Sequence, residues 1–208
     1  MNREKVTEYI KNLGDLISQL GGDQNYFEFS DRMNDIREKL SFCKHNSRYP
    51  HIIAETTLKL LEVENNNPNS DYIKKHIIEL VGMKELYKDI SSAGSLITQY
   101  SNMEKIDYKK RIIYTEEIFK NMPPEKGREF MNQSINVWGK MLKKEEIEED
   151  IPNPQIVLTA YCRSLKDDRQ KEELVDNLSD HGISVSTELK EEWFTVHNIE
   201  LTQRDSSE

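Results

Sequence analysis

The chain has 208 residues, of which 36% are hydrophobic and 32% charged, and its formal net charge is −9. This length suits one large domain or two small ones, with a core built from narrow apolar stripes between wide solvated faces. An acidic chain repels a phosphate backbone, so nonspecific nucleic-acid binding is disfavoured. No stretch reaches the roughly 18 apolar residues of a membrane span, and the charged N-terminus lacks the pattern of a signal peptide, so we expect a cytoplasmic protein with no membrane partner.

Amphipathic helices are the first prediction, because apolar residues recur at three- and four-residue spacing through most of the chain before residue 145. The first helix is expected over residues 3–20 and ends at a Gly-Gly pair, since glycine adopts the left-handed C′ conformation at little cost. Ser30 is a good N-cap for the second helix, and Pro50 fits the first turn of the third. A polar, Asn-rich loop at 64–70 then separates the third helix from the fourth.

The fourth helix is expected over residues 70–90. Gly82 lies inside it at a cost of about 1 kcal/mol relative to alanine, so this position is a site of close helix packing or of a break. A further apolar stripe begins at Tyr108 and stops before Pro123, which removes a backbone donor and marks a firm boundary. The last helix of this region is expected over 130–142. These patterns together predict an N-terminal bundle or array of about seven helices.

A domain boundary is predicted at 146–154. This stretch is an acidic charge run followed by prolines, a composition typical of a linker. The predicted organisation is therefore a helical domain at 1–145, this linker, a small C-terminal unit at 155–201 and a disordered tail at 202–208.

The C-terminal unit is predicted to be a β-α-β-β arrangement. Its first apolar run, "IVLTAYC" at 156–162, has the length and the β-branched and aromatic content of a buried strand. A helix follows, with a cap at one of the aspartates 167–168 and an end at Gly182, where a helix-to-strand connection favours a positive φ. "ISVST" at 183–187 alternates with period two, and "WFTVHNIEL" at 193–201 is the last strand. The predicted fold class is mostly α with this small β-containing unit, and the alternative is an all-α chain.

The junction after the predicted helix has a second interpretation. "GIS" followed by "STELKEEW" resembles the turn and second helix of bacterial helix-turn-helix repressors. In that arrangement Glu188 and Glu191 would face phosphates, whereas the start of a reading helix presents neutral or basic donors. The helix-to-strand interpretation is therefore favoured, and it predicts that Ile183 and Val185 are more buried than the serines that alternate with them.

The titratable residues show no catalytic or metal-binding pattern. No two of the five histidines stand at i, i+4 spacing, and neither CxxC nor HExxH occurs. No glycine-rich phosphate loop follows 156–162, so the sequence predicts no cofactor. Cys162 and Arg163, at the end of the first predicted strand, are the alternative location for a small-molecule or enzymatic site. Enzymatic activity is thus left open, and no catalytic residue is assigned.

The candidate partner-binding residues are large and apolar. Trp138 and Met141 belong to the last predicted helix of the N-terminal region, and Trp193 and Phe194 belong to the last predicted strand. Tryptophan dominates interaction hot spots and methionine repacks readily against different partners. These side chains are therefore the ones we expect at an interface with another protein or with a second copy of the chain.

The leading hypothesis is a non-enzymatic interaction or regulatory protein that binds a protein partner, or itself, through apolar helical surfaces. The acidic net charge suits a basic partner. The alternative from another class is a nucleic-acid-associated regulator, which would use the short basic run formed by Lys109, Lys110 and Arg111.

Overall fold

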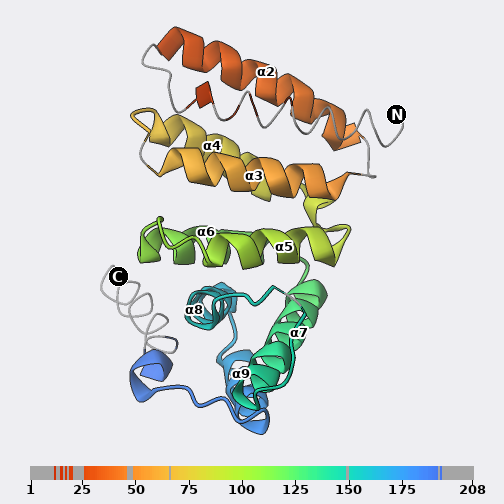
Figure 1. The fold of residues 1–208 in the computed structure, drawn as a ribbon, viewed down its shortest axis with the longest axis vertical. Coiled ribbons are helices and arrows are strands. Elements are labelled where there is room, and N and C mark those ends of the chain that lie inside the picture. The colour runs from red at the N-terminus through yellow and green to blue at the C-terminus, as the bar shows by residue number, and fades with distance from the viewer. Residues whose placement is uncertain are drawn as a thin grey trace, which may run out of the picture. The chain divides into compact units, whose positions relative to one another are not determined.

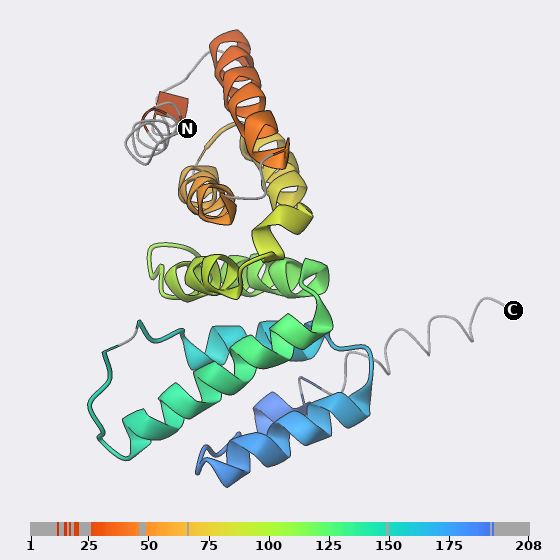
Figure 2. The same cartoon turned by 90° about the vertical axis from the view of Figure 1, so that its right-hand side faces the viewer.

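The computed structural model describes residues 12, 15, 17, 19–20, 26–45, 49–65, 67–148, 150–191 and 193. In this part of the chain the regular structure is helical (Figure 1 and Figure 2). None of the described helices is long and apolar enough to cross a membrane. The chain divides into two compact units, Met1–Tyr100 and Ser101–Glu208. The boundary between the units falls before the last residue of helix α5 (Ile90–Ser101), whereas the sequence prediction placed a boundary at 146–154.

The N-terminal unit is built from packed helices with an apolar interior. Its described elements are α2 (Tyr26–His45), α3 (Pro50–Glu64), α4 (Ser70–Val81), η1 (Lys84–Tyr87) and α5 (Ile90–Ser101). Helix α3 packs against α2, α4 and η1, and Pro50 occupies its first turn as predicted. The ring of Phe29 on α2 meets the edge of Tyr72 on α4 at a centroid distance of 5.6 Å. Apolar burial between these helices therefore holds the unit together.

Helix α4 is shorter than the sequence predicted. The expected helix over 70–90 ends at Val81, because Gly82 acts as its C-cap and η1 then begins a new direction. The Tyr87 hydroxyl donates a 2.6 Å hydrogen bond to the Val81 carbonyl oxygen. One of the carbonyl groups that a helix end leaves open is thus satisfied from the following turn.

The C-terminal unit contains α6 (Tyr108–Asn121), α7 (Pro124–Leu142), α8 (Pro154–Ser164) and α9 (Asp168–Asp180). Helices α6 and α8 pack against each other. The N-termini are capped by side chains that accept backbone N–H bonds: Asp107 for α6, Asn153 for α8 and Asp167 for α9. These caps fix where each helix begins.

The predicted first strand at 156–162 is wrong, because this run lies within α8. Its seven residues are all buried, from Ile156 to Cys162. A short run that is apolar on every side fits a buried helix as well as a buried strand, and periodicity does not separate the two. The Asn153 cap and the proline at position 154 resolve it in favour of helix.

The remaining predicted strands are also not formed in the described residues. Residues 183–186 have no strand partner, and residues 187–191 and Trp193 are helical, which supports the all-α alternative. The predicted burial pattern is nevertheless confirmed, since Ile183 and Val185 are half-buried and the alternating serines are exposed. Phe194 and the rest of the predicted last strand lie outside the described residues.

Residues 151–153, at the end of the predicted linker, are tied to the C-terminal unit. The Asn102 amide donates to the Ile151 carbonyl oxygen at 2.8 Å, and the Asn153 backbone N–H donates to the Ser101 hydroxyl at 3.1 Å. The Trp138 indole donates to the Pro152 carbonyl oxygen at 2.9 Å. The chain entering α8 is therefore fixed at three successive residues.

Helices α7 and α9 end in the same backbone motif with different residues at the key position. In α9 the N–H groups of Gly182 and Ile183 donate to the carbonyls of Ser179 and Leu178, and Gly182 has φ of 76°. In α7 the same two bonds follow Lys143, and Lys144 has φ of 57°. Both ends are Schellman motifs, which favour glycine at this left-handed position.

This pair predicts opposite effects for opposite substitutions. Gly182→Ala is expected to lower the free energy of unfolding by about 1 kcal/mol, because alanine is strained at positive φ. Lys144→Gly is expected to raise it by up to about 1 kcal/mol for the same reason. Urea denaturation of the two variants measures both. A loss of stability in Lys144→Gly would show that its side chain contributes more than its backbone strain costs.

Candidate functional site

A hollow of about 360 Å³ in the C-terminal unit is lined by residues of α6, α7 and α8 and by the segments that follow α6 and α8. Its apolar wall combines aromatic, aliphatic, proline and thioether groups: Phe119, Met122, Pro124, Tyr161 and Leu165. A second hollow of about 190 Å³ shares three of its lining residues, Arg128, Tyr161 and Gln170. The two hollows therefore adjoin, and we call them together the α6–α9 groove.

The floor of the groove is aromatic. Tyr161 on α8 and Phe119 on α6 meet edge to face with a centroid distance of 5.0 Å and an interplanar angle of 67°. Phe130 on α7 lies 6.0 Å from Phe119, so helices from different parts of the sequence contribute one ring cluster. Burial raises the pKa of the Tyr161 phenol, while the charge of Arg128 opposes this, and the ring stays neutral at physiological pH.

Gly127 brings α7 close to this floor. A Cβ atom at this position would lie 3.4 Å from Cε2 of Tyr161 and 3.9 Å from the sulfur of Met122. A larger side chain at position 127 would therefore project into the wall of the groove and displace the tyrosine ring.

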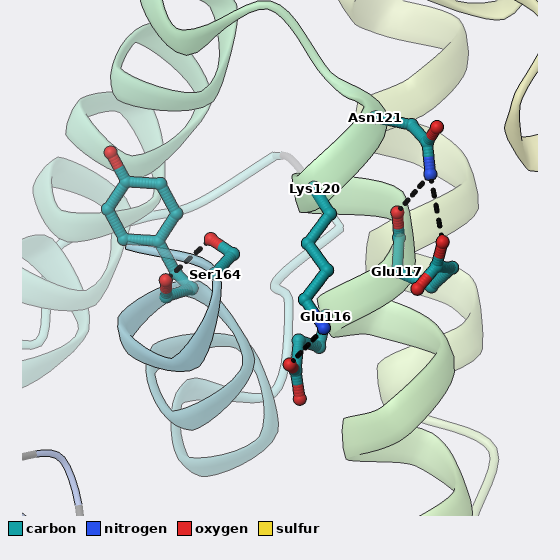
Figure 3. A network of polar contacts seen from close by, with 6 residues as sticks. Glu116, Glu117, Lys120, Asn121 and Ser164 are labelled. Atoms are coloured by element: carbon teal, nitrogen blue, oxygen red, sulfur yellow. Dashed lines mark hydrogen bonds and ion pairs between the residues drawn. The ribbon is translucent and has the colours of Figure 1, made fainter. Parts of the chain in front are cut away.

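The end of α8 shapes one side of the groove. The Ser164 hydroxyl donates a 2.6 Å hydrogen bond to the Tyr161 carbonyl oxygen, as Figure 3 shows. The Leu165 N–H donates to the same carbonyl at 3.2 Å, and Leu165 then leaves the helix in an extended conformation. Ser164, Leu165 and Lys166 are thereby directed to the rim.

Basic side chains line the groove although the chain as a whole is acidic. They are Lys120, Arg128 and Lys166. Lys120 pairs with Glu116 one turn earlier at 2.7 Å, while Asn121 and Glu117 bond to each other on another side of α6 (Figure 3). Among the described residues neither Arg128 nor Lys166 forms an ion pair. The groove therefore has uncompensated positive charge at its rim.

The second hollow combines one cation, Arg128, and one carboxylate, Glu173, with the side-chain amides of Asn132, Gln170 and Asn177. Asn177 on α9 donates a 3.0 Å hydrogen bond to the side-chain oxygen of Asn132 on α7. Gln170 lies at the junction of the two hollows. Side-chain amides both donate and accept, so this end of the groove can bond to a peptide backbone in either direction.

The structure separates the residues that the sequence predicted for partner binding. Trp138 is 3% exposed with its indole N–H bonded to Pro152, and Trp193 is 1% exposed. Met141 is 45% exposed at the end of α7, beside the exposed Leu142. Only Met141 of the described candidates thus presents its side chain to solvent, and none of them lines the α6–α9 groove.

The residues of the nucleic-acid alternative lie in the first turn of α6. The backbone N–H groups of Lys109 and Lys110 donate to the Asp107 cap. The Arg111 guanidinium donates to the Ser101 carbonyl oxygen at 2.9 Å and is half-buried. The Arg111 side chain is therefore engaged within the unit, whereas the Lys109 side chain is exposed to solvent.

Cys162, the alternative enzymatic candidate, is buried inside the unit. It has no exposed surface, and burial raises the pKa of its thiol to about 12 against the opposing charge of Lys171. A thiol with this pKa is not a nucleophile at neutral pH. The neighbouring Tyr161 and Ser164 line the groove instead, a placement that a helical reading of 154–164 would have indicated.

In the part of the chain that the structure describes, no group of three or more histidine, cysteine, aspartate or glutamate side chains could hold a metal ion. Comparison of the sequence with protein-family models and curated proteins, and of the fold with solved structures, finds no match.

Proposed function

We propose that the Ser101–Glu208 unit is an interaction module that binds a short acidic segment of a partner protein in the α6–α9 groove. The observation that supports this most directly is the rim of the groove. Arg128 and Lys166 lie beside an aromatic floor and form no ion pair among the described residues. Cationic groups without partners favour a ligand that brings carboxylates.

The groove also offers an apolar anchor point. Met122 and Leu165 flank the Phe119–Tyr161 ring pair, and methionine adapts to ligands of different shape. An aromatic or aliphatic side chain of the partner would be buried there, and such anchors carry most of the binding energy at protein interfaces.

The amides at the far end complete the recognition of a peptide. Asn132 and Asn177 bond to each other across α7 and α9, and Gln170 joins this pair to the basic end. A segment that lies along the groove would thus meet cations, an apolar anchor and backbone partners in turn.

The positive charge of the groove rim favours an acidic partner segment, whereas the net charge of the whole chain suggested a basic one. A net charge of −9 favours a basic partner at long range. The rim formed by Lys120, Arg128 and Lys166 has the opposite sign, and short-range complementarity determines which segment fits the groove. Lys109 does not extend this rim, because it lies about 16 Å from Lys120 along the axis of α6.

Selection from a random peptide library displayed on phage tests the proposal. Peptides that bind the full chain are expected to be enriched in aspartate, glutamate and aromatic residues. Arg128→Glu and Lys166→Glu are each expected to weaken the selected peptides about tenfold, measured by fluorescence anisotropy. Lys109→Glu is the matched control, because it makes the same change of charge on an exposed lysine of the same unit.

The proposal fails if the selected peptides are not acidic, if no peptide is selected, or if the control variant weakens binding as much as the groove variants. An oligonucleotide of the same charge serves as a further comparison. Equal binding of this oligonucleotide, lost in Lys109→Glu, would favour the nucleic-acid alternative instead.

A further inference from the structure

The N-terminal unit contains a separate hollow of about 200 Å³ between α2, α3 and α4. Its walls are apolar and rich in thioether and branched aliphatic groups: Met33, Ile36, Leu60, Leu80 and Met83. His76 and Glu79 of α4 and Arg37 of α2 also line it. It is thus an apolar cleft with a small polar cluster, the composition typical of small-molecule sites.

His76 is the unusual member of this cluster. Its residue is 6% exposed, and its Nδ1 lies 3.3 Å from Oε2 of Glu79. Its Nε2 is buried and has no hydrogen-bond partner among the described residues. The ring of Tyr72 meets the imidazole edge to face at 4.9 Å. A buried polar atom without a partner is rare in folded proteins, so this nitrogen favours a bound group that would pair with it.

The chemistry of that missing group follows from the tautomer of His76. An ionised carboxylate only accepts hydrogen bonds, so the Nδ1 facing Glu79 carries the proton. Burial lowers the pKa of His76 below its ordinary value of 6.5, despite the opposing hydrogen bond and charge of Glu79. The neutral imidazole therefore presents Nε2 as an acceptor, and the complementary group is an N–H or O–H donor.

We propose that this cleft binds a small aromatic molecule with one N–H or O–H donor, of the class of indoles and phenols, with the donor on Nε2 of His76. A cavity of about 150 Å³ lined by aliphatic residues accommodates benzene, so the present cleft has room for a bicyclic ring. The sulfur atoms of Met33 and Met83 favour an aromatic ligand over an aliphatic one.

The other polar groups leave Nε2 available for this ligand. Arg37 lies 4.0 Å from Glu79 and holds the carboxylate that orients the imidazole. The Ser41 hydroxyl donates to the Glu38 carbonyl oxygen at 2.7 Å, so its proton is committed elsewhere. The site therefore depends on one directional bond and on apolar contact.

Isothermal titration of the full chain with indole, and with benzofuran as the matched ligand, tests the inference. Benzofuran has the same ring shape with an oxygen in place of the N–H. Because this oxygen and Nε2 are both acceptors, no hydrogen bond can form between them. Indole is expected to bind at least about tenfold more tightly than benzofuran. In His76→Leu this preference is expected to disappear, because the acceptor is removed. His51→Leu is the control, since His51 is exposed on α3.

A pH series on the wild-type chain provides a second measurement that requires no variant. Among the described residues, the ionisable groups around His76 are Tyr72, Lys75 and Glu79 on α4 and Arg37 and Glu38 on α2. Because the pKa of His76 is lowered, indole affinity is expected to hold at neutral pH and to fall only below pH 6.5. Protonation then turns Nε2 into a donor, and the preference over benzofuran is lost.

Equal affinity for the two ligands at neutral pH would overturn the inference, as would absence of binding by either. A loss of indole binding in His51→Leu equal to that in His76→Leu would also overturn it. None of these outcomes bears on the α6–α9 groove, which belongs to the other unit.

Discussion

Replacement of Trp138 by alanine is expected to lower the free energy of unfolding by about 3 to 5 kcal/mol. The indole is 3% exposed within α7. Its N–H donates to the Pro152 carbonyl oxygen at 2.9 Å, at the point where the chain enters α8. The substitution therefore removes a large buried ring and leaves a buried carbonyl group without its donor. Urea denaturation followed by circular dichroism measures the change.

Two further substitutions test whether the loss of stability comes from the buried ring of Trp138. Trp138→Phe keeps one six-membered ring and loses the five-membered ring with its N–H donor, so its cost is expected to be smaller than that of alanine, about 2 kcal/mol. Met141→Ala is the control on the same helix, and it is expected to cost less than about 1 kcal/mol because this side chain is 45% exposed. A cost of Met141→Ala equal to that of Trp138→Ala would contradict the assignment of Trp138 to the core.

Cys162 is expected to react with iodoacetamide about a thousandfold more slowly than an exposed cysteine at pH 8. Burial raises the pKa of its thiol from the ordinary 9.0 to about 12, a difference of about three pH units. Each unit lowers the fraction of reactive thiolate about tenfold. The rate is measured by mass spectrometry in a Cys43→Ser background, so that one thiol is followed.

The pH dependence of the labelling rate distinguishes the folded chain from the unfolded one. In the folded chain the rate is expected to keep rising as the pH approaches 12, whereas in denaturant it levels off above about pH 9. Between these values the unfolded thiol releases a proton that the folded one retains, so the free energy of unfolding falls as the pH rises. Rapid labelling of the native chain at pH 8 would show that Cys162 is accessible and that its burial is wrong.

Local sequence signals were sufficient for much of the helical architecture. Pro50 begins α3 and Gly182 ends α9, because each residue has a backbone preference that acts within one turn. The mostly helical fold follows from the periodicity of the apolar residues. The predicted helix over 70–90 ends early at Gly82, the glycine that the sequence marked as a site of close packing or a break, and a bond from Tyr87 stabilises this break.

The C-terminal strand prediction failed for a different reason. Residues 156–162 are all buried, Thr159 included, and without an alternation of buried and exposed positions a strand and a buried helix look alike. The Asn153-Pro154 pair is the helix-start signal that decides the question, and it deserved more weight than the β-branched content.

The α6–α9 groove was only partly accessible to sequence reasoning. Once α8 is taken as a helix, Tyr161 and Ser164 share one face at i and i+3, and Leu165 follows at the end of the helix. The contact of Tyr161 with Phe119 joins residues that are distant in the sequence, and no local pattern predicts it. The aromatic identity of Trp138 suggested an interface, but residue type alone does not distinguish a buried ring from an exposed one.

The three hydrogen bonds that hold residues 151–153 determine how the chain tolerates insertions before α8. With Ile151, Pro152 and Asn153 fixed, the exposed residues between Lys143 and Glu148 form a loop whose two ends are held independently of its length. The entropy cost of closing a loop grows only with the logarithm of its length, about 0.6 kcal/mol for each doubling. Residues inserted in this loop therefore leave the positions of α7 and α8 unchanged. The acidic run tolerates changes in length, whereas the helices on either side of it do not.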